Sequence, residues 1–222
     1  MTVTTSPTQS DRPEPAQQAP VQAVRFSPKV PLILFLTTLV VVLGSDLFIK
    51  SWSFEHVAGQ PVELVAGADN TPADIPQHIG MSVVPKLLAL RLTLNTGAIF
   101  GIGKGAQWFF VFVSVIATAF ICFLFWRAPR NAYTIQICYA LILAGALGNM
   151  YDRMVYNAVR DMFWLFPGVH LPFGLNWPGG SPDMYPWLFN IADVALIVGV
   201  LTLMVLVQLA DMRQRKLAKT SD

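Results

Sequence analysis

The sequence contains few charged residues. Asp, Glu, Lys and Arg make up 13% of its 222 residues, whereas a soluble domain usually carries about 25%. Hydrophobic residues account for 54% of the chain, and the mean hydropathy is +0.53. This composition excludes an ordinary soluble domain and indicates a polytopic membrane protein. The formal net charge of +2 is too small to indicate a nucleic-acid partner, and we expect none.

Cysteine and histidine are also scarce. Cys122 and Cys138 lie inside hydrophobic segments, where a thiol is usually a small apolar packing residue. The three histidines are scattered over predicted loops, and no spacing typical of a metal site occurs. We therefore expect no metal and no other cofactor. Cysteine or serine proteolysis is disfavoured, because neither thiol lies near the polar residues described below and no histidine lies on a predicted span.

Four hydrophobic runs are long enough to cross a bilayer, which needs about 20 apolar residues. They cover residues 30–49, 108–126, 133–150 and 187–209. The first run lacks a small-residue cleavage site, so it is interpreted as a span and not as a removed signal peptide. The predicted fold class is an all-α polytopic membrane protein. It has four transmembrane helices and a small extracytoplasmic region that is β-rich and amphipathic.

Basic residues flank three parts of this pattern. Residues 1–29, which are rich in Pro, Gln, Ser and Thr, predict a disordered tail with basic residues next to the first span. Arg127 and Arg130 bracket the turn between the second and third spans, and residues 211–222 form a basic tail. The positive-inside rule places all three in the cytoplasm. The membrane domain, residues 30–210, then sends two loops to the outer side.

These two loops differ in composition. In the first, residues 51–107, the segments VELVAG (62–67) and LLALRLTLN (87–95) predict short strands, and DNTPADIPQ (69–77) predicts a turn-rich link. The second, residues 151–186, is dense in Trp, Phe, Pro and Gly. Aromatic residues of this kind are typical of the headgroup level of a membrane.

The fourth hydrophobic run contains an acidic residue. Asp193 is the only charge between Trp187 and Leu209, and a carboxylate at or within a bilayer is costly and usually functional. Asn190 lies three residues earlier, on the same face of a helix. Asp161 follows the third run. Two carboxylates at one membrane surface suggest acid–base chemistry.

Further polar residues lie near the outer ends of the other spans. Asp46 and Lys50 are four residues apart, so they share a helix face and are predicted to form an ion pair. Asn149, Asp152 and Arg153 have spacings that let them face one partner. The simplest expectation for Asp152 and Arg153 is a structural salt bridge with each other.

Two short glycine motifs complete the pattern. Asn95 followed by Gly97 predicts a turn, in which the asparagine side chain bonds the backbone. Gly145 and Gly148 permit close approach of another helix to the third span.

Taken together, these residues resemble the lipoprotein signal peptidases, also called signal peptidase II. The resemblance covers about residues 30–210. Its blocks are Asp46 with Lys50, NTGAIFG at 95–101, GALGNMYDR at 145–153, VRDMF at 159–163 and FNIADVALIVG at 189–199.

The resemblance implies an aspartic endopeptidase whose catalytic pair is Asp161 and Asp193. It also implies residues for substrate positioning or structural support: Asp46, Lys50, Asn95, Gly97, Asn149, Asp152, Arg153, Asn190 and Ala192. The chain departs from the family at Arg160, where a small or apolar residue is common. A basic side chain that points toward Asp161 would lower the pKa of its carboxyl. The stretch between the two aspartates is also longer than usual.

The resemblance further implies a diacylglyceryl-modified prolipoprotein as substrate, cleaved on the N-terminal side of its lipidated cysteine. It implies a monomer in the lipid of the bacterial cytoplasmic (inner) membrane, with the active site at the outer face. The residues alone leave two other functions open: a small proton- or ion-coupled membrane transporter, with Asp193, Asp46 and Lys50 as a relay, and a membrane scaffold. The clustering of polar residues at one membrane face is evidence against a transport path.

Overall fold

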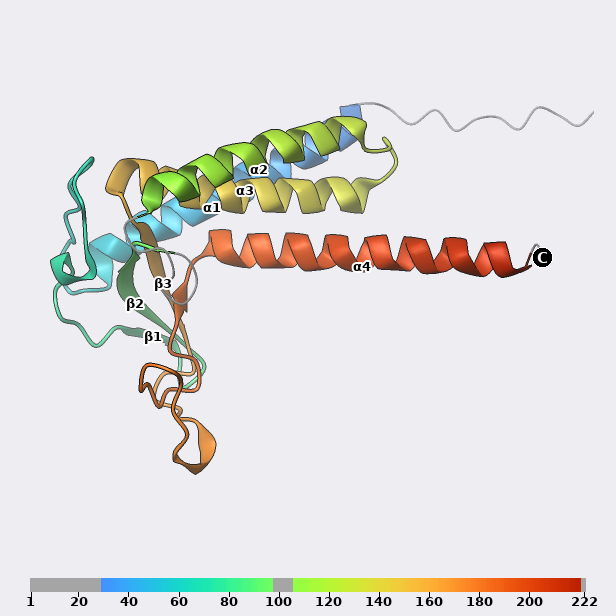
Figure 1. The fold of residues 1–222 in the computed structure, drawn as a ribbon. Coiled ribbons are helices and arrows are strands. Elements are labelled where there is room, and N and C mark those ends of the chain that lie inside the picture. The colour runs from blue at the N-terminus through green and yellow to red at the C-terminus, as the bar shows by residue number, and fades with distance from the viewer. Residues whose placement is uncertain (1–28, 98–105, 221–222) are drawn as a thin grey trace, which may run out of the picture.

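A computed structural model describes residues 29–97 and 106–220, which form four long helices and a small sheet (Figure 1). The helices are α1 (Lys29–His56), α2 (Gln107–Arg127), α3 (Tyr133–Tyr156) and α4 (Ile191–Thr220). Each is long and apolar enough to cross a membrane, so the four predicted spans are confirmed. The predicted disordered tail lies outside the described residues, apart from Lys29.

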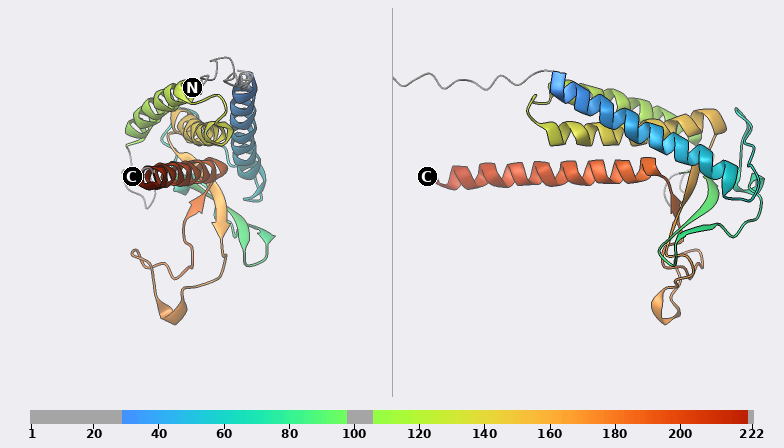
Figure 2. Two further views of the ribbon diagram at one scale, coloured as in Figure 1. Left: turned by 90° about the vertical axis from the view of Figure 1, so that its right-hand side faces the viewer. Right: turned by 180° about the vertical axis from the view of Figure 1, so that it is seen from behind.

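The prediction of an all-α class is only partly right. Four strands form one antiparallel sheet in the order β1-β2-β3-β4. Their bounds are β1 (Met81–Val84), β2 (Leu88–Asn95), β3 (Val159–Leu165) and β4 (Leu188–Phe189). Both predicted outer loops contribute to it, so segments far apart in the sequence lie side by side at one end of the helices (Figures 1 and 2).

The strand predictions had mixed outcomes. The strand predicted at 87–95 is confirmed as β2, but the strand predicted at 62–67 is wrong. The reason is local, because the side chain of Asn70 forms hydrogen bonds with both the N–H and the carbonyl of Val65. It accepts from the Val65 N–H at 3.0 Å and donates to the Val65 carbonyl at 2.8 Å, which leaves neither for a sheet ladder. Strands β3 and β4 were not predicted.

Three helices extend several residues beyond the predicted spans, among them α3, which continues to Tyr156. Helix α1 continues to His56, and α4 continues through the basic segment to Thr220. In contrast, α4 begins at Ile191, although its hydrophobic run begins at Trp187. Two residues between Trp187 and Ile191, Leu188 and Phe189, form β4 and pair with β3.

Helix α3 is the most buried of the four spans. Viewed along the helices it lies among α1, α2 and α4 (Figure 2, left). Glycines allow the close approach: a Cβ at Gly148 of α3 would lie 2.5 Å from Oδ2 of Asp46, and one at Gly199 of α4 would lie 2.8 Å from Cγ1 of Ile142. Small residues of this kind let helix backbones pack closely in a membrane.

Two hydrophobic clusters hold this arrangement together. The first joins α1, α2 and α3 through residues that include Phe35, Phe125 and Tyr139. The second packs one face of β2 and β3 against the end of α1 and includes Phe54, Leu92, Leu94, Ala158 and Met162. The sheet is thereby fixed to the end of the bundle where α1 and α3 finish and α4 starts.

Candidate active site

The sheet brings the two candidate catalytic aspartates to one place. Asp161 lies on β3, and Asp193 lies in the first turn of α4. Strand β4 pairs with β3 through Phe163 with Phe189 and Trp164 with Leu188. This register delivers Asn190, the next residue after β4, to the neighbourhood of Asp161.

Asn190 and Asp193 form a reciprocal cap at the start of α4. The Asp193 N–H donates to Oδ1 of Asn190 at 3.0 Å, and the Asn190 N–H donates to Oδ2 of Asp193 at 3.1 Å. This is the bonding pattern of a capping box, with the residues Asn and Asp in place of the usual Ser or Thr and Glu. The cap fixes the Asp193 carboxylate at the positive end of the helix dipole, where an acidic side chain interacts favourably with the unpaired backbone N–H groups.

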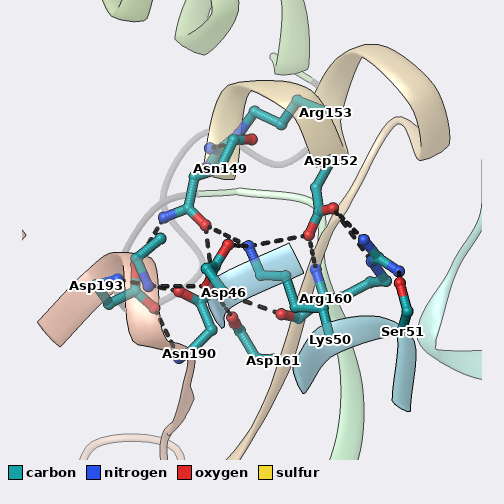
Figure 3. Close-up of polar contacts among 11 residues, drawn as sticks. Asp46, Lys50, Ser51, Asn149, Asp152, Arg153, Arg160, Asp161, Asn190 and Asp193 are labelled. Carbon is teal, nitrogen blue, oxygen red and sulfur yellow. Dashed lines mark hydrogen bonds and ion pairs between the residues drawn. The ribbon is translucent and has the colours of Figure 1, made fainter. Parts of the chain in front are cut away.

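The same asparagine connects both carboxylates (Figure 3). Its side-chain amide donates to Oδ1 of Asp161 at 2.6 Å and to Oδ1 of Asn149 at 3.1 Å. Asn149 in turn donates to Oδ1 of Asp193 at 2.8 Å. Because every one of these groups is hydrogen-bonded, the two carboxylates have fixed orientations.

Asp161 is 2% exposed, and its environment favours the neutral acid. Burial raises the pKa of its carboxyl well above the usual range, and the negative charge of Asp193 raises it further. Hydrogen bonds from Asn190 and Asn95, together with the charge of Lys50, act in the opposite direction but do not outweigh burial. Asp193, in contrast, is only half-buried.

The expectation that Arg160 could lower the pKa of Asp161 is wrong. Successive residues of a strand point to opposite faces, so the guanidinium of Arg160 lies on the other side of β3 from the Asp161 carboxylate. It pairs with Asp152 at 2.8 Å and donates to Oγ of Ser51 at 3.3 Å. Its guanidinium also lies over the ring of Tyr156, 4.7 Å from the centroid.

A buried group of charges supports the asparagines (Figure 3). Lys50 is completely buried. Its ammonium lies 2.7 Å from Asp46, which confirms the predicted ion pair, and 3.1 Å from Asp152. It also donates to Oδ1 of Asn149 at 3.1 Å. Lys50 therefore orients the amide that holds Asp193.

Asp46 has a second function in the packing of the helices. Its Oδ1 accepts a hydrogen bond of 2.9 Å from the Ala192 N–H, one of the backbone donors that the start of a helix leaves without an intrahelical partner. Ala192 is fully buried against α3, close to Gly145 and Gly148. Ala192 was predicted to be a support residue although its side chain is apolar. The close packing against α3 explains why this residue is small.

The predicted salt bridge between Asp152 and Arg153 is wrong. Adjacent residues on a helix do not face each other, so Asp152 points to Lys50 and Arg160 while Arg153 points elsewhere. The Arg153 guanidinium donates to the carbonyl oxygens of Gly97 at 3.1 Å and Asn149 at 3.3 Å. It ties the end of the first outer loop to α3.

The predicted turn at Asn95 is confirmed, since the Gly97 N–H donates to Oδ1 of Asn95 at 3.0 Å. The rest of that motif, residues 98–101, lies outside the described residues. Sequence reasoning missed Tyr185, whose pKa is raised by burial and further by the charges of Asp193 and Asp161. No local spacing links Tyr185 to the aspartates, because the β3–β4 pairing creates their proximity.

The part of the chain that the structure describes contains no group of three His, Cys, Asp or Glu side chains that could hold a metal ion.

Comparisons with known proteins agree with this geometry. A family model for signal peptidase II matches residues 38–209. The chain is 31% identical to the lipoprotein signal peptidase of Latilactobacillus sakei over 180 residues, which is 81% of this chain and 97% of that protein. It is also 31% identical to the lipoprotein signal peptidase of Syntrophus aciditrophicus, over 86% of this chain and 99% of that protein.

A solved structure of a bacterial membrane enzyme has the same fold, with a TM-score of 0.58 and 25% identity. The match covers 80% of this chain and 88% of that one. The matched region of the family model includes Asp46, Asp161 and Asp193 and all four described helices in whole or in part. The chain therefore belongs to the signal peptidase II family of membrane peptidases.

Proposed function

We propose that this peptidase uses Asp161 and Asp193 as its catalytic pair to remove signal peptides from diacylglyceryl-modified prolipoproteins. Cleavage falls on the N-terminal side of the lipidated cysteine. One observation carries the assignment of the pair: a single side chain, that of Asn190, is bonded to both aspartates at the start of a membrane-spanning helix.

The two carboxylates have different environments, which supports different protonation states. Asp193 receives two hydrogen bonds, from Asn149 and from the Asn190 backbone, and lies at a helix N-terminus. Asp161 is almost fully buried, and burial disfavours its charged form. We assign the shared proton to Asp161 and the negative charge to Asp193.

Hydrolysis then follows without a covalent intermediate. Asp193 takes a proton from a water molecule, whose oxygen attacks the scissile carbonyl carbon, while Asp161 gives its proton to the carbonyl oxygen. The resulting gem-diol collapses when Asp193 passes its proton to the leaving nitrogen and a hydroxyl proton returns to Asp161. The C–N bond breaks, and the pair regains its starting state with one proton.

The site is proposed to lie at the outer face of the bacterial cytoplasmic membrane, with both termini in the cytoplasm. Arg127 ends α2 and Arg130 lies in the short turn before α3, and positive residues favour the cytoplasmic side. The sheet and the polar network are at the opposite ends of these two helices (Figure 1).

A proton- or ion-coupled transporter is not favoured. The charged residues that could form a proton relay instead contact one another at one site. Lys50 forms ion pairs with Asp46 and Asp152 and donates a hydrogen bond to Asn149. The four residues lie in the C-terminal parts of α1 and α3, at the end of the bundle that carries the sheet.

The test uses purified full-length protein with one precursor in lipidated and unlipidated form. We expect cleavage of the lipidated form alone, and loss of cleavage in Asp161→Asn and in Asp193→Asn with normal accumulation in the membrane. Asp211→Asn, which changes an exposed carboxylate far along α4, serves as the matched control and retains activity. Processing by either active-site variant at the wild-type rate would remove that residue from the mechanism.

A further inference from the structure

Residues 166–187, here called the aromatic loop, connect β3 to β4 and form a structured projection outside the helical bundle (Figure 1). The loop leaves β3 a few residues after Asp161 and returns to β4 just before Asn190. It therefore joins the two strands that position the catalytic pair. The mechanism proposed above uses none of the residues at its tip.

Hydrogen bonds hold the neck of the loop in shape. Leu171 N–H donates to the Pro182 carbonyl at 2.8 Å, and Met184 N–H donates to the Val169 carbonyl at 2.8 Å. The indole of Trp177 donates to the Asp183 carbonyl at 3.0 Å. Its ring contacts that of Trp187, with centroids 4.7 Å apart, which connects the tip to the base.

This ordered loop presents apolar side chains outward at its tip. Phe173 is 97% exposed and Leu175 is 57% exposed. Phe173 also has a φ of 61°, a left-handed conformation that a bulky residue adopts at a cost. An exposed aromatic residue in a strained backbone, on a loop whose neck is well bonded, indicates that the tip is built to contact something.

Composition identifies the partner as lipid. Residues 171–182 carry no charged side chain. The ionisable side chains nearest to them in the loop, His170 and Asp183, lie 3.7 Å apart at its neck. Trp177, Tyr185 and Trp187 in this loop belong to the two residue types, Trp and Tyr, that are enriched at membrane–water interfaces.

The position of the loop supports the same partner. Viewed along the helices, it extends sideways from the bundle and does not cover its end (Figure 2, left). Its base leads directly into α4, whose outward surface exposes apolar residues from Val194 onward, including Ile197 and Val198. A loop displaced sideways at the level where a spanning helix begins lies over the bilayer beside that helix.

We propose that the tip of the aromatic loop, Phe173 with Leu175, inserts into the outer-leaflet interface as a monotopic anchor. Because the loop joins β3 to β4, its attachment to lipid sets the height of Asp161 and Asn190 relative to the bilayer surface. This second statement rests on the proposed catalytic pair, whereas the insertion of the tip does not.

The test uses the full-length protein in lipid nanodiscs, with Cys122 and Cys138 replaced by alanine. A single cysteine at Phe173→Cys carries a polarity-sensitive fluorophore. The matched control is Val65→Cys, a 64% exposed apolar position in the first outer loop. We expect a blue-shifted emission at position 173, quenched several-fold more by lipids with a shallow spin label than by aqueous iodide. At position 65 the order of the two quenchers is reversed.

Two results would overturn the proposal. If iodide quenches the fluorophore at position 173 as strongly as the fluorophore at position 65, the tip faces water. Protection from both iodide and spin-labelled lipid would mean that a protein, such as a second copy of this chain, covers it. A Phe173→Ser, Leu175→Ser double variant tests the second statement, that attachment of the loop sets the height of Asp161 and Asn190. A raised KM for membrane-embedded substrate with unchanged kcat supports this statement. Unchanged kinetics would refute it, and the insertion result would still stand.

Discussion

The side-chain amide of Asn190 donates a hydrogen bond of 2.6 Å to Asp161. Its carbonyl oxygen simultaneously caps α4 through the Asp193 N–H. Asn190, which the sequence predicted to share a helix face with Asp193 and to serve as a support residue, thus contacts both aspartates.

Asn190→Ala removes the bond to Asp161 and the cap of α4 together. We expect kcat to fall by about 100-fold, the loss that a misplaced catalytic group produces, and stability to fall by about 1 kcal/mol for the lost cap. Steady-state kinetics on the lipidated precursor and thermal unfolding in detergent measure the two effects. Asn70→Ala is the matched control, because Asn70 also makes several side-chain hydrogen bonds but lies outside the site. Equal kcat values in the two variants would contradict the prediction.

The raised pKa of Asp161 predicts a pH dependence of stability. Its folded-state pKa lies above the usual value of about 3.9, so the folded protein binds this proton more tightly than the unfolded chain does. The contribution of this carboxyl to the free energy of unfolding is therefore fully present at pH values below about 3.9 and is lost as pH rises through the folded-state pKa. Asp161→Asn keeps the side chain neutral, so its melting temperature relative to wild type should rise across that pH range. A difference that does not change with pH would argue against a neutral Asp161.

Lys50→Met leaves Asp46 and Asp152 buried without their shared cation. Removing one partner from a buried charge group typically costs about 3–5 kcal/mol, so we expect markedly lower accumulation and a lower melting temperature. Lys219→Met, an exposed position near the end of α4, should have no measurable effect. Wild-type stability in Lys50→Met would show that the buried charges do not depend on one another.

Gly148→Ala tests the close approach of α1 and α4 to α3. The added methyl group would lie 2.5 Å from Oδ2 of Asp46 and 3.3 Å from Cβ of Ala192, so those groups must shift. Overpacking of this kind costs about 1–3 kcal/mol, and the displaced Asp46 should lower activity as well. The control is Gly44→Ala in α1, where no atom lies within 4 Å of the new methyl group. Thermal unfolding and activity assays on both variants test this prediction. Equal melting temperatures and activities would mean that α3 accommodates the methyl group.

The four spans were predictable because they depend on composition over about 20 residues, which a sequence displays directly. The sheet was not, because pairing between β2 and β3 joins segments separated by the whole of α2 and α3. The error at residues 62–67 has a different origin. The apolar pattern there suits a strand, but Asn70 satisfies the backbone locally.

In the candidate site, too, contacts within one helical turn were predictable and contacts created by the fold were not. The relations of Asn190 to Asp193 and of Asp46 to Lys50 were predictable, because both pairs lie within one helical turn. The partner of Asp152 was not, since its choice of Arg160 over Arg153 depends on how β3 leaves the end of α3. Tyr185 likewise reaches the site through the fold and not through any local motif.

The bond from the Ala192 N–H to Asp46 joins the first spanning helix to the last. During synthesis α4 leaves the ribosome after α1, α2 and α3, and until it enters the membrane Asp46 lacks the Ala192 N–H as a donor. Asp193 and its cap arrive with that same helix. On the proposed catalytic pair, a nascent chain lacks one of its two carboxylates through most of its insertion, and proteolytic activity begins only when α4 docks.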